Sequence, residues 1–304
     1  MVPEQLQSWF NARWQPDMGA IDGKDLAFLA GLVARNRPTR VVEIGVASGF
    51  STACLAPLVS GHAPGPARID SFDLAERFYV DPRHPVGYLL AEALPHPGVT
   101  VNLHTGATCL DVAARLDGPV DLCFIDAAHR HPWPLIDTLG ILPLMRPGGI
   151  MVHHDLKMYL DTNRDWWANG PKIVLDHVPP DLRLYPDAAT EAEAARHLRA
   201  RSVDGNIFAF RVPEDRAALE WSLAQGFYLG WDPQWPILVS NPFADRFEGH
   251  LAATYGEWVG RAFAEGRRRY SRKGGDWLVP VQAAMARVRR PVSRALRRLG
   301  VVRG

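Results

Sequence analysis

The stretch Val41-Val-Glu-Ile-Gly-Val-Ala-Ser-Gly-Phe-Ser-Thr52 decides the fold of this chain. It begins with a short apolar run, Val41 to Ile44, which is typical of a buried strand. The loop Gly45 to Gly49 follows, and Ser51-Thr52 places hydroxyl side chains at the start of a predicted helix that reaches about Val59. A strand, a tight loop and a helix in direct succession predict the first unit of an α/β sheet.

Apolar and helical segments alternate on both sides of this unit. Before it, Leu26 to Val33 carries apolar residues at helical spacing, up to the break at Arg37-Pro38. After it, we predict strands at Ala67–Asp73, Val99–Leu103, Val120–Ile125 and Gly149–His153, and helices at Val86–Leu94, Cys109–Leu116 and Leu135–Met145. Strands separated by helices at this spacing predict a parallel sheet covered on both faces, which is a Rossmann-like α/β fold.

The pattern loosens after residue 160. A helix at Gly170–His177 and a strand at Gly205–Val212 complete the predicted sheet domain. Helical stretches follow at Asp215–Ala224 and from Arg246 onward, and no strand pattern is present after Val239. We therefore predict two parts, with residues 1–212 as the sheet domain with its amino-terminal helices and residues 213–304 as a helical carboxy-terminal extension with a basic tail.

Composition and charge exclude several classes of protein. The formal net charge is +1 over 304 residues, so the chain lacks the positive field that drives binding to nucleic acid. Three cysteines without CxxC spacing argue against a disulfide framework or a thiolate zinc site. The first ten residues lack the basic start and the apolar run of a signal peptide, and no run of about 18 apolar residues is present. We expect a cytoplasmic protein with a small-molecule partner.

The loops that follow the strands are expected to meet at one edge of the sheet, where ligands bind in such folds. The loop from Gly45 to Gly49 contains no cation and no Gly-Lys-Ser/Thr element, and Ala47 stands where a dinucleotide fingerprint has its second glycine. Such a loop suits a carboxylate better than a polyphosphate. Asp73, at the end of the next strand, is placed to accept hydrogen bonds from both ribose hydroxyls. A nucleoside with a carboxylate and no phosphate describes S-adenosylmethionine.

The stretch Glu43 to Thr52 resembles the cofactor loop of class I methyltransferases of the catechol and caffeoyl-CoA O-methyltransferase kind, with its acidic-x-Gly and Gly-aromatic-Ser elements. Further matches are Gly106-Ala-Thr108, Phe124-Ile-Asp-Ala-Ala-His129, Leu144-Met-Arg-Pro-Gly-Gly149 and Ile150-Met-Val-His-His-Asp155. The Asp-x-x-His and His-Asp elements also resemble the bacterial family of sugar O-methyltransferases and cephalosporin-hydroxylase-like proteins. The resemblance covers residues 25–212 and implies a mostly parallel seven-stranded sheet. It assigns binding of S-adenosylmethionine to Glu43, Gly45, Gly49, Ser51, Asp73, Ala107, Thr108 and Asp126.

The resemblance also implies a metal site and a base. Metal-dependent members bind a divalent cation through an aspartate after the fourth strand and an Asp-Asn or Asp-Asp pair after the fifth. Asp126 and Asp155 match, whereas Leu156 stands at the third ligand position and His154 is the neighbouring substitute. Because Mg²⁺ prefers oxygen ligands, metal-dependent and metal-free mechanisms both stay open. His129 occupies the position of the basic lysine of the catechol-type enzymes, and an imidazole suits removal of a hydroxyl proton.

These motifs favour an S-adenosylmethionine-dependent methyltransferase that acts on a small-molecule, sugar or phenolic hydroxyl, with His129 as general base and Mg²⁺ as a candidate second cofactor. The alternatives are a metal-independent N- or O-methyltransferase, a nicotinamide-dependent oxidoreductase or hydroxylase-associated protein, and a non-catalytic binding module. Asp73 also fits a loop carboxylate, and Asp126 a helix cap. The arginines from Arg287 to Arg303 form a basic tail that suits an anionic membrane, an acidic partner or a solvated end. A homo-oligomer is compatible with the sequence.

Overall fold

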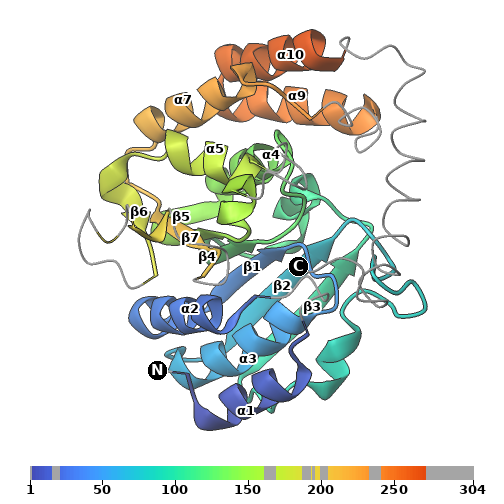
Figure 1. The fold of residues 1–304 in the computed structure, drawn as a ribbon. Helices are drawn as coiled ribbons and strands as arrows, with labels where there is room; N and C mark the ends of the chain where they lie inside the picture. The colour runs from blue at the N-terminus through green and yellow to red at the C-terminus, as the bar shows by residue number, and fades with distance from the viewer. Residues whose placement is uncertain are drawn as a thin grey trace. The chain divides into compact units, whose positions relative to one another are not determined.

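The computed structural model describes residues 2–15, 21–160, 169–186, 193, 196–198, 205–232 and 241–271 (Figure 1). The chain divides into two compact units, residues 1–226 and 227–304. The first unit contains the whole sheet. Helix α7 (Ala217–Gln225) also lies within it, so this unit extends past the predicted boundary at residue 212.

The first unit is built on a seven-stranded sheet with the strand order β3-β2-β1-β4-β5-β7-β6. Its strands are β1 (Arg40–Ile44), β2 (Ala67–Asp73), β3 (Val99–Thr105), β4 (Val120–Ile125), β5 (Met145–His153), β6 (Arg183–Leu184) and β7 (Phe208–Arg211). Strands β1 to β5 are parallel, and β7 pairs antiparallel with both β5 and β6. The strand order reverses between the neighbours β1 and β4, which creates the switch point where ligands bind in such sheets. The predicted Rossmann-like, mostly parallel sheet is confirmed.

Helices cover both faces of the sheet, which is why its middle strands β1 and β4 are largely apolar. The helices are α1 (Glu4–Arg13), α2 (Gly23–Asn36) and α3 (Phe50–His62) on one face, and α4 (Trp133–Ile141), α5 (Gly170–His177) and α7 on the other (Figure 1). Leu122 and Phe124 of β4 belong to the buried cluster formed with α1 to α3. Cys123 between them points to the opposite face, because successive strand residues alternate.

Two predicted helices are shorter turns in the structure. The segment predicted at Val86–Leu94 is a 3₁₀ helix at Tyr88–Glu92, which starts after Gly87 (φ 74°) and buries only one side chain. The segment predicted at Cys109–Leu116 forms two 3₁₀ turns, at Cys109–Asp111 and Ala113–Arg115. Neither piece buries a continuous apolar face, and that burial stabilises most helices in proteins. By contrast, the predicted bounds of Ala67–Asp73, Val120–Ile125 and Gly170–His177 are confirmed.

The second unit contains a helical hairpin with an aromatic core. Helices α9 (Asn241–Tyr255) and α10 (Glu257–Ser271) are joined at Gly256, whose φ of 91° lets the chain reverse. Ring centroids in its core lie between 5.1 and 6.2 Å apart, and the rings belong to Phe227, Trp231, Phe247 and Phe263. The helical character predicted for the carboxy-terminal region is thus confirmed within residues 241–271. No helix among the described residues is long and apolar enough to cross a membrane.

Candidate active site

The carboxyl ends of β1 to β5 lie at one edge of the sheet, because these strands run in the same direction (Figure 1). Backbone hydrogen bonds join the loops that leave them. The N–H of Gly45 donates to the carbonyl oxygen of Phe72 at 2.8 Å, and the N–H of Asp126 donates to the last residue of β1 at 2.8 Å. The N–H of His154 donates to the last residue of β4 at 3.0 Å. The loops after these strands therefore meet, as the sequence predicts.

Glu43 is a buried carboxylate that holds the loop after β1 in shape. Its Oε1 accepts a hydrogen bond from the Ser51 hydroxyl at 2.5 Å, and its Oε2 accepts one from the Thr52 hydroxyl. Burial raises the pKa of Glu43 to about 7, although the hydroxyl donors act in the opposite direction. Both carboxylate oxygens are engaged inside the protein, so Glu43 and Ser51 contribute to this edge by fixing the start of α3.

Gly45 and Gly49 are required by close contacts within the protein itself. Gly45 has a φ of 89°, and a Cβ atom there would lie 2.2 Å from the carbonyl oxygen of Asp126. Gly49 has a φ of 85°, and a Cβ atom there would lie 2.9 Å from the Cα atom of Gly87. Residues with side chains rarely adopt this left-handed region. The sequence predicts that these glycines let a ligand approach, and in the structure they also let neighbouring loops approach each other.

Asp73 connects the loops after β1, β2 and β3. Its Oδ2 accepts hydrogen bonds from the backbone N–H groups of Val46 (2.9 Å) and Ala47 (3.0 Å), and its Oδ1 accepts one from Ala75 (2.8 Å). The backbone N–H of Ala107 donates to the Asp73 carbonyl oxygen at 3.1 Å. A carboxylate has about four acceptor sites, so Asp73 keeps capacity for a further donor.

Thr108 is engaged with its own turn. Its hydroxyl donates to Oδ2 of Asp111 at 2.8 Å, and its backbone N–H donates to the same atom at 2.9 Å. The side chain therefore caps the 3₁₀ turn that follows. The N–H groups of Ala107 and Thr108 and the hydroxyl proton of Thr108 are thus all donated within the protein.

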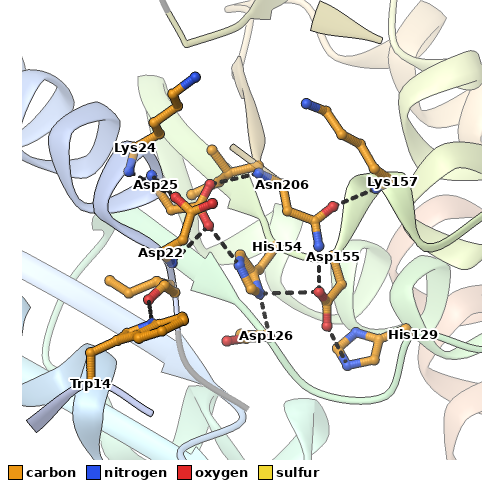
Figure 2. Close-up of polar contacts among 12 residues, drawn as sticks. Trp14, Asp22, Lys24, Asp25, Asp126, His129, His154, Asp155, Lys157 and Asn206 are labelled. Atoms are coloured by element: carbon orange, nitrogen blue, oxygen red, sulfur yellow. Dashed lines mark hydrogen bonds and ion pairs between the residues drawn. The ribbon is translucent and has the colours of Figure 1, made fainter. Parts of the chain in front are cut away.

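His129 and Asp155 form a pair beyond the ends of β4 and β5 (Figure 2). Nε2 of His129 lies 2.8 Å from Oδ2 of Asp155, and the two side chains are 27% and 21% exposed. Asp155 has a left-handed φ of 56°, which turns the chain as it leaves β5. In the part of the chain that the structure describes, Nδ1 of His129 makes no hydrogen bond. Asp155 thus fixes Nε2 of His129, whereas Nδ1 has no hydrogen-bond partner among the described residues.

His154 is bound by carboxylates at both ring nitrogens. Nδ1 lies 3.1 Å from Oδ1 of Asp126 and 3.6 Å from Oδ1 of Asp155, and Nε2 lies 3.0 Å from Oδ2 of Asp25. Figure 2 shows the ring between Asp25 on α2 and Asp126 after β4. The His154 side chain is only 6% exposed, so these contacts are largely shielded from solvent.

The sequence did not reveal Asp25 and Asn206 as members of this cluster. Oδ1 of Asp25 accepts a hydrogen bond from the backbone N–H of Asn206 at 2.7 Å, and the Asn206 side-chain amide donates to Oδ1 of Asp155 at 2.6 Å. The amide oxygen of Asn206 accepts from the backbone N–H of Lys157 at 2.6 Å. The one local signal is the capping box of Asp22 and Asp25, and that pattern marks a helix start rather than a site.

Charge interactions shift the pKa values within the cluster. Burial lowers the pKa of His154, but Asp126 and Asp155 raise it by more, so it lies well above its ordinary value of 6.5. Burial also lowers the pKa of His129, but the charge of Asp155 raises it by more, so this pKa lies above its ordinary value. Burial raises the pKa of Asp155, but the charges of His129 and His154 bring it below its ordinary value of 3.8. All three shifts favour the charged forms of these side chains.

The three residues predicted as metal ligands come together in the structure. One ligand atom from each of Asp126, His154 and Asp155 lies within 4.8 Å of the others. The set does not suit Mg²⁺, because this ion prefers oxygen and His154 offers nitrogen. Both nitrogens of His154 already face carboxylates, and Leu156 at the third ligand position is fully buried and apolar. The residues present form a charge cluster rather than an oxygen cage.

Comparison with protein families finds a match that covers most of the strands ending at this edge of the sheet. Residues 42–156 match the family model described as a methyltransferase domain. The matched segment begins in β1 and ends just after Asp155, so it includes the loop after β1 together with Asp73 and His129. A search of curated proteins finds no match.

Several solved structures are similar to this chain. An O-methyltransferase of Bacillus cereus in complex with SAH is 17% identical, with 68% of this chain and 89% of that chain covered and a TM-score of 0.47. The O-methyltransferase TomG of Streptomyces achromogenes in complex with SAM is 20% identical, with 69% and 90% covered and a TM-score of 0.40. The SAH-bound methyltransferase PaMTH1 of Podospora anserina is 16% identical, with 70% and 89% covered and a TM-score of 0.45. On the family match, residues 42–156 form a methyltransferase domain, set in the Rossmann-like sheet described above.

Proposed function

We propose that this methyltransferase transfers the methyl group of S-adenosylmethionine to a hydroxyl group of a small molecule, with His129 as the general base. The observation that carries the proposal is the pair of His129 and Asp155, whose Nε2 and Oδ2 atoms lie 2.8 Å apart. Asp155 accepts the hydrogen bond from Nε2–H, so in the neutral ring Nδ1 carries the lone pair. An imidazole oriented in this way is suited to accept a hydroxyl proton.

The proposed step balances in atoms and charge. As the acceptor oxygen bonds to the methyl carbon, the bond from that carbon to the sulfonium sulfur breaks, and S-adenosylhomocysteine leaves. The hydroxyl proton moves to Nδ1 of His129, and the negative charge of Asp155 stabilises the resulting imidazolium. Alignment of the methyl group with the hydroxyl supplies much of the rate enhancement in a reaction of this type.

The cofactor is proposed to bind at the loops after β1, β2 and β3. The remaining acceptor capacity of Asp73 suits the ribose hydroxyls, and the backbone from Gly45 to Gly49 and at Ala107 suits close contact with the nucleoside. Other residues predicted to bind the cofactor have side chains engaged within the protein and are proposed to shape these loops, namely Glu43, Ser51, Thr108 and Asp126.

The partner proposed for the site is a small-molecule acceptor such as a phenol, a sugar or an aliphatic alcohol. A net charge of +1 over the whole chain gives no general attraction for nucleic acid. Cytoplasmic localisation and a homo-oligomer stay predictions. The basic tail from Arg287 to Arg303 lies outside the described residues, and so does its predicted contact with an anionic membrane or an acidic partner.

A labelled methyl-transfer assay against phenols, sugars and alcohols tests the proposal, with calorimetric titration of S-adenosylmethionine alongside it. His129→Gln is expected to lower kcat about a hundredfold or more while the cofactor Kd stays unchanged, because only the base is removed. His62→Gln, at the far end of α3, is the matched control and is expected to keep wild-type turnover. Methylation of nitrogen instead of oxygen, or unchanged kcat in His129→Gln, would contradict the proposal.

A further inference from the structure

We propose that the carboxy-terminal unit, residues 227–304, binds the surface of a bilayer that contains anionic phospholipid. The contact is made by four residues that we call the basic–aromatic patch, namely Tyr228, Leu229, Arg269 and Tyr270. They lie outside the matched residues 42–156, so binding through them is separate from the proposed methyl transfer.

Charge is divided unequally between the two units of the chain. Residues 227–304 contain 14 lysines and arginines against 6 aspartates and glutamates, which gives a formal charge of +8. Residues 1–226 contain 20 against 27, which gives −7. The net charge of +1 for the whole chain therefore conceals a strongly basic unit. A positive unit of this kind attracts an anionic surface over distances of about 10 Å at 0.1 M salt.

An exposed turn places apolar side chains at the surface of this basic unit. Tyr228 and Leu229 are each 42% exposed, whereas Phe227 and Trp231 on either side of them are buried. Trp231 anchors the turn, because its indole N–H donates to the carbonyl oxygen of Phe227 at 3.0 Å. The turn is thus fixed at both ends, and the side chains in its middle are accessible.

The same turn lies against the end of α10. A Cβ atom added at Gly266 would come 2.4 Å from the carbonyl oxygen of Phe227, so the two backbones are close. The Tyr270 hydroxyl donates to the carbonyl oxygen of Tyr228 at 2.9 Å. The guanidinium carbon of exposed Arg269 lies 5.6 Å from the centroid of the Tyr270 ring. These contacts join the apolar turn and the arginine into one surface.

The arginines of α10 differ in the partners that they have. Arg267 lies 2.6 Å from Asp245 of α9, and Arg268 lies 2.5 Å from Glu265. Arg269 makes no ion pair within the described part of the chain. Its guanidinium is therefore available to a lipid phosphate, which arginine binds through paired hydrogen bonds.

An arginine beside tyrosine and leucine suits the interface of a bilayer. Tyrosine rings lie at the level of the lipid headgroups, and a leucine side chain gains free energy when it enters the boundary of the acyl chains. A nucleic acid also attracts arginine, but it offers an exposed leucine no apolar layer to enter. Since none of the described helices is long and apolar enough to cross a membrane, the unit is expected to lie on the surface.

Cosedimentation of the purified full chain with vesicles tests the proposal. Vesicles of equal parts phosphatidylglycerol and phosphatidylcholine are expected to bind the chain, whereas vesicles of phosphatidylcholine alone are expected to bind it far more weakly. Binding to the anionic vesicles is expected to fall in about 1 M salt, because salt screens the attraction. Equal binding to the two kinds of vesicle would overturn the proposal.

Two single variants test the patch itself. Arg269→Gln is expected to weaken binding to the anionic vesicles about fivefold, because one positive charge near the surface is lost. Leu229→Ser is expected to weaken it about threefold or more, because less apolar area enters the interface. Arg83→Gln and Leu160→Ser make the same changes at exposed positions of the first unit and are the matched controls, expected to bind as the wild type does.

Three results would overturn the proposal. Wild-type vesicle binding by both Arg269→Gln and Leu229→Ser would show that other residues make the contact. A chain that binds a duplex oligonucleotide but no vesicle would have nucleic acid as its partner instead. A dimer that sedimentation velocity detects in the wild type, and that Leu229→Ser dissociates, would show that a second copy of the chain covers the patch.

Discussion

The loop after β1 and the cluster around His154 occupy the same edge of the sheet, and contacts of different range hold them. In the loop, Glu43 bonds to Ser51, which is eight residues away. In the cluster, His154 bonds to Asp25, which is 129 residues away, and Asp25 bonds to Asn206, which is 181 residues away. The loop is held by its own residues together with Asp73 at the end of β2 and the loop after β4, whereas the cluster exists only when α2, β5 and the segment before β7 are all in place.

The loop and the cluster are therefore expected to respond to substitutions in different ways. The loop has little space, because two of its glycines have positive φ and lie against other backbone atoms, so steric changes are expected to dominate there. The cluster is a balance of buried charges and hydrogen bonds, so removal of one partner is expected to act mainly through the groups left behind. Four predictions test the contrast.

The largest effect is expected from Gly45→Ala. The added Cβ would lie 2.2 Å from the carbonyl oxygen of Asp126 at a φ of 89°, so the backbone must move. We expect the free energy of unfolding, measured in urea, to fall by about 3 kcal/mol or more. Gly61→Ala is the control, because nothing lies within 4 Å of its added Cβ, and its stability should stay within about 1 kcal/mol of wild type. Equal losses in both variants would refute the steric explanation.

Asn206→Leu breaks the cluster at its longest-range member. It removes the donor to Asp155 and the acceptor of the Lys157 backbone N–H. We expect a loss of about 2 kcal/mol in the free energy of unfolding, because buried polar groups lose their partners. Asn102→Leu, which removes a 3.2 Å hydrogen bond to Asp70 at a partly exposed position, should cost less than about 1 kcal/mol. A similar loss of stability in the two variants would show that the hydrogen bonds of Asn206 contribute no more to folding than those of the partly exposed Asn102.

Asp73→Asn keeps an acceptor oxygen and removes the charge of the carboxylate. The cofactor Kd from calorimetry is expected to rise about tenfold, because hydrogen bonds to a charged acceptor are stronger than those to an amide. Asp81→Asn is the control, since Asp81 pairs with exposed Arg83 in the following loop, and it should leave the Kd unchanged. An unaltered Kd in Asp73→Asn would mean that the charge of Asp73 does not contribute to cofactor binding and that the carboxylate only stabilises the loop after β1.

The smallest expected effect is a shift in the pH profile of methyl transfer. As a base, His129 must be neutral, so kcat should rise with pH through the pKa of His129, which Asp155 raises above 6.5 against the effect of burial. Asp155→Asn removes the charge that raises this pKa, and the inflection should then move to lower pH. The measured quantity is the position of the inflection rather than the rate. An inflection that moves to higher pH would exclude His129 as the titrating base.

Sequence-based prediction worked where the information is local. The bounds of β2 and β4 were predictable because each begins directly after a Gly-Pro break, β2 with apolar residues spaced between polar ones and β4 as a mostly apolar run. The position of Asp73 at a strand end follows directly. The segments at 86–94 and 109–116 were wrongly predicted as helices, because their apolar residues have helical spacing but are not buried along a continuous face. The spacing of apolar residues within a segment does not show whether other elements pack against those residues.

The composition of the cluster was predictable only in part. Asp126, His129, His154 and Asp155 lie in strand-end motifs, and the structure brings them together. Asp25 has the local pattern of a helix cap, and no local pattern singles out Asn206, so nothing near them in the chain indicates a contact with His154. The metal prediction rested on residue types at ligand positions. Because nothing in the sequence connects Asp25 with His154, it could not be predicted that both ring nitrogens of His154 face carboxylates.

The bond between Asp25 and Asn206 has a consequence for the timing of assembly on the ribosome. At about 5–20 residues per second, the 181 residues that separate these partners take roughly 10–40 s to synthesise. During that interval α2 and the strands up to β5 are already available to fold, but Oδ1 of Asp25 still needs water or a substitute donor. The end of β5 therefore receives its last partner only when the segment before β7 arrives, and the cluster around His154 is completed after the loop that follows β1.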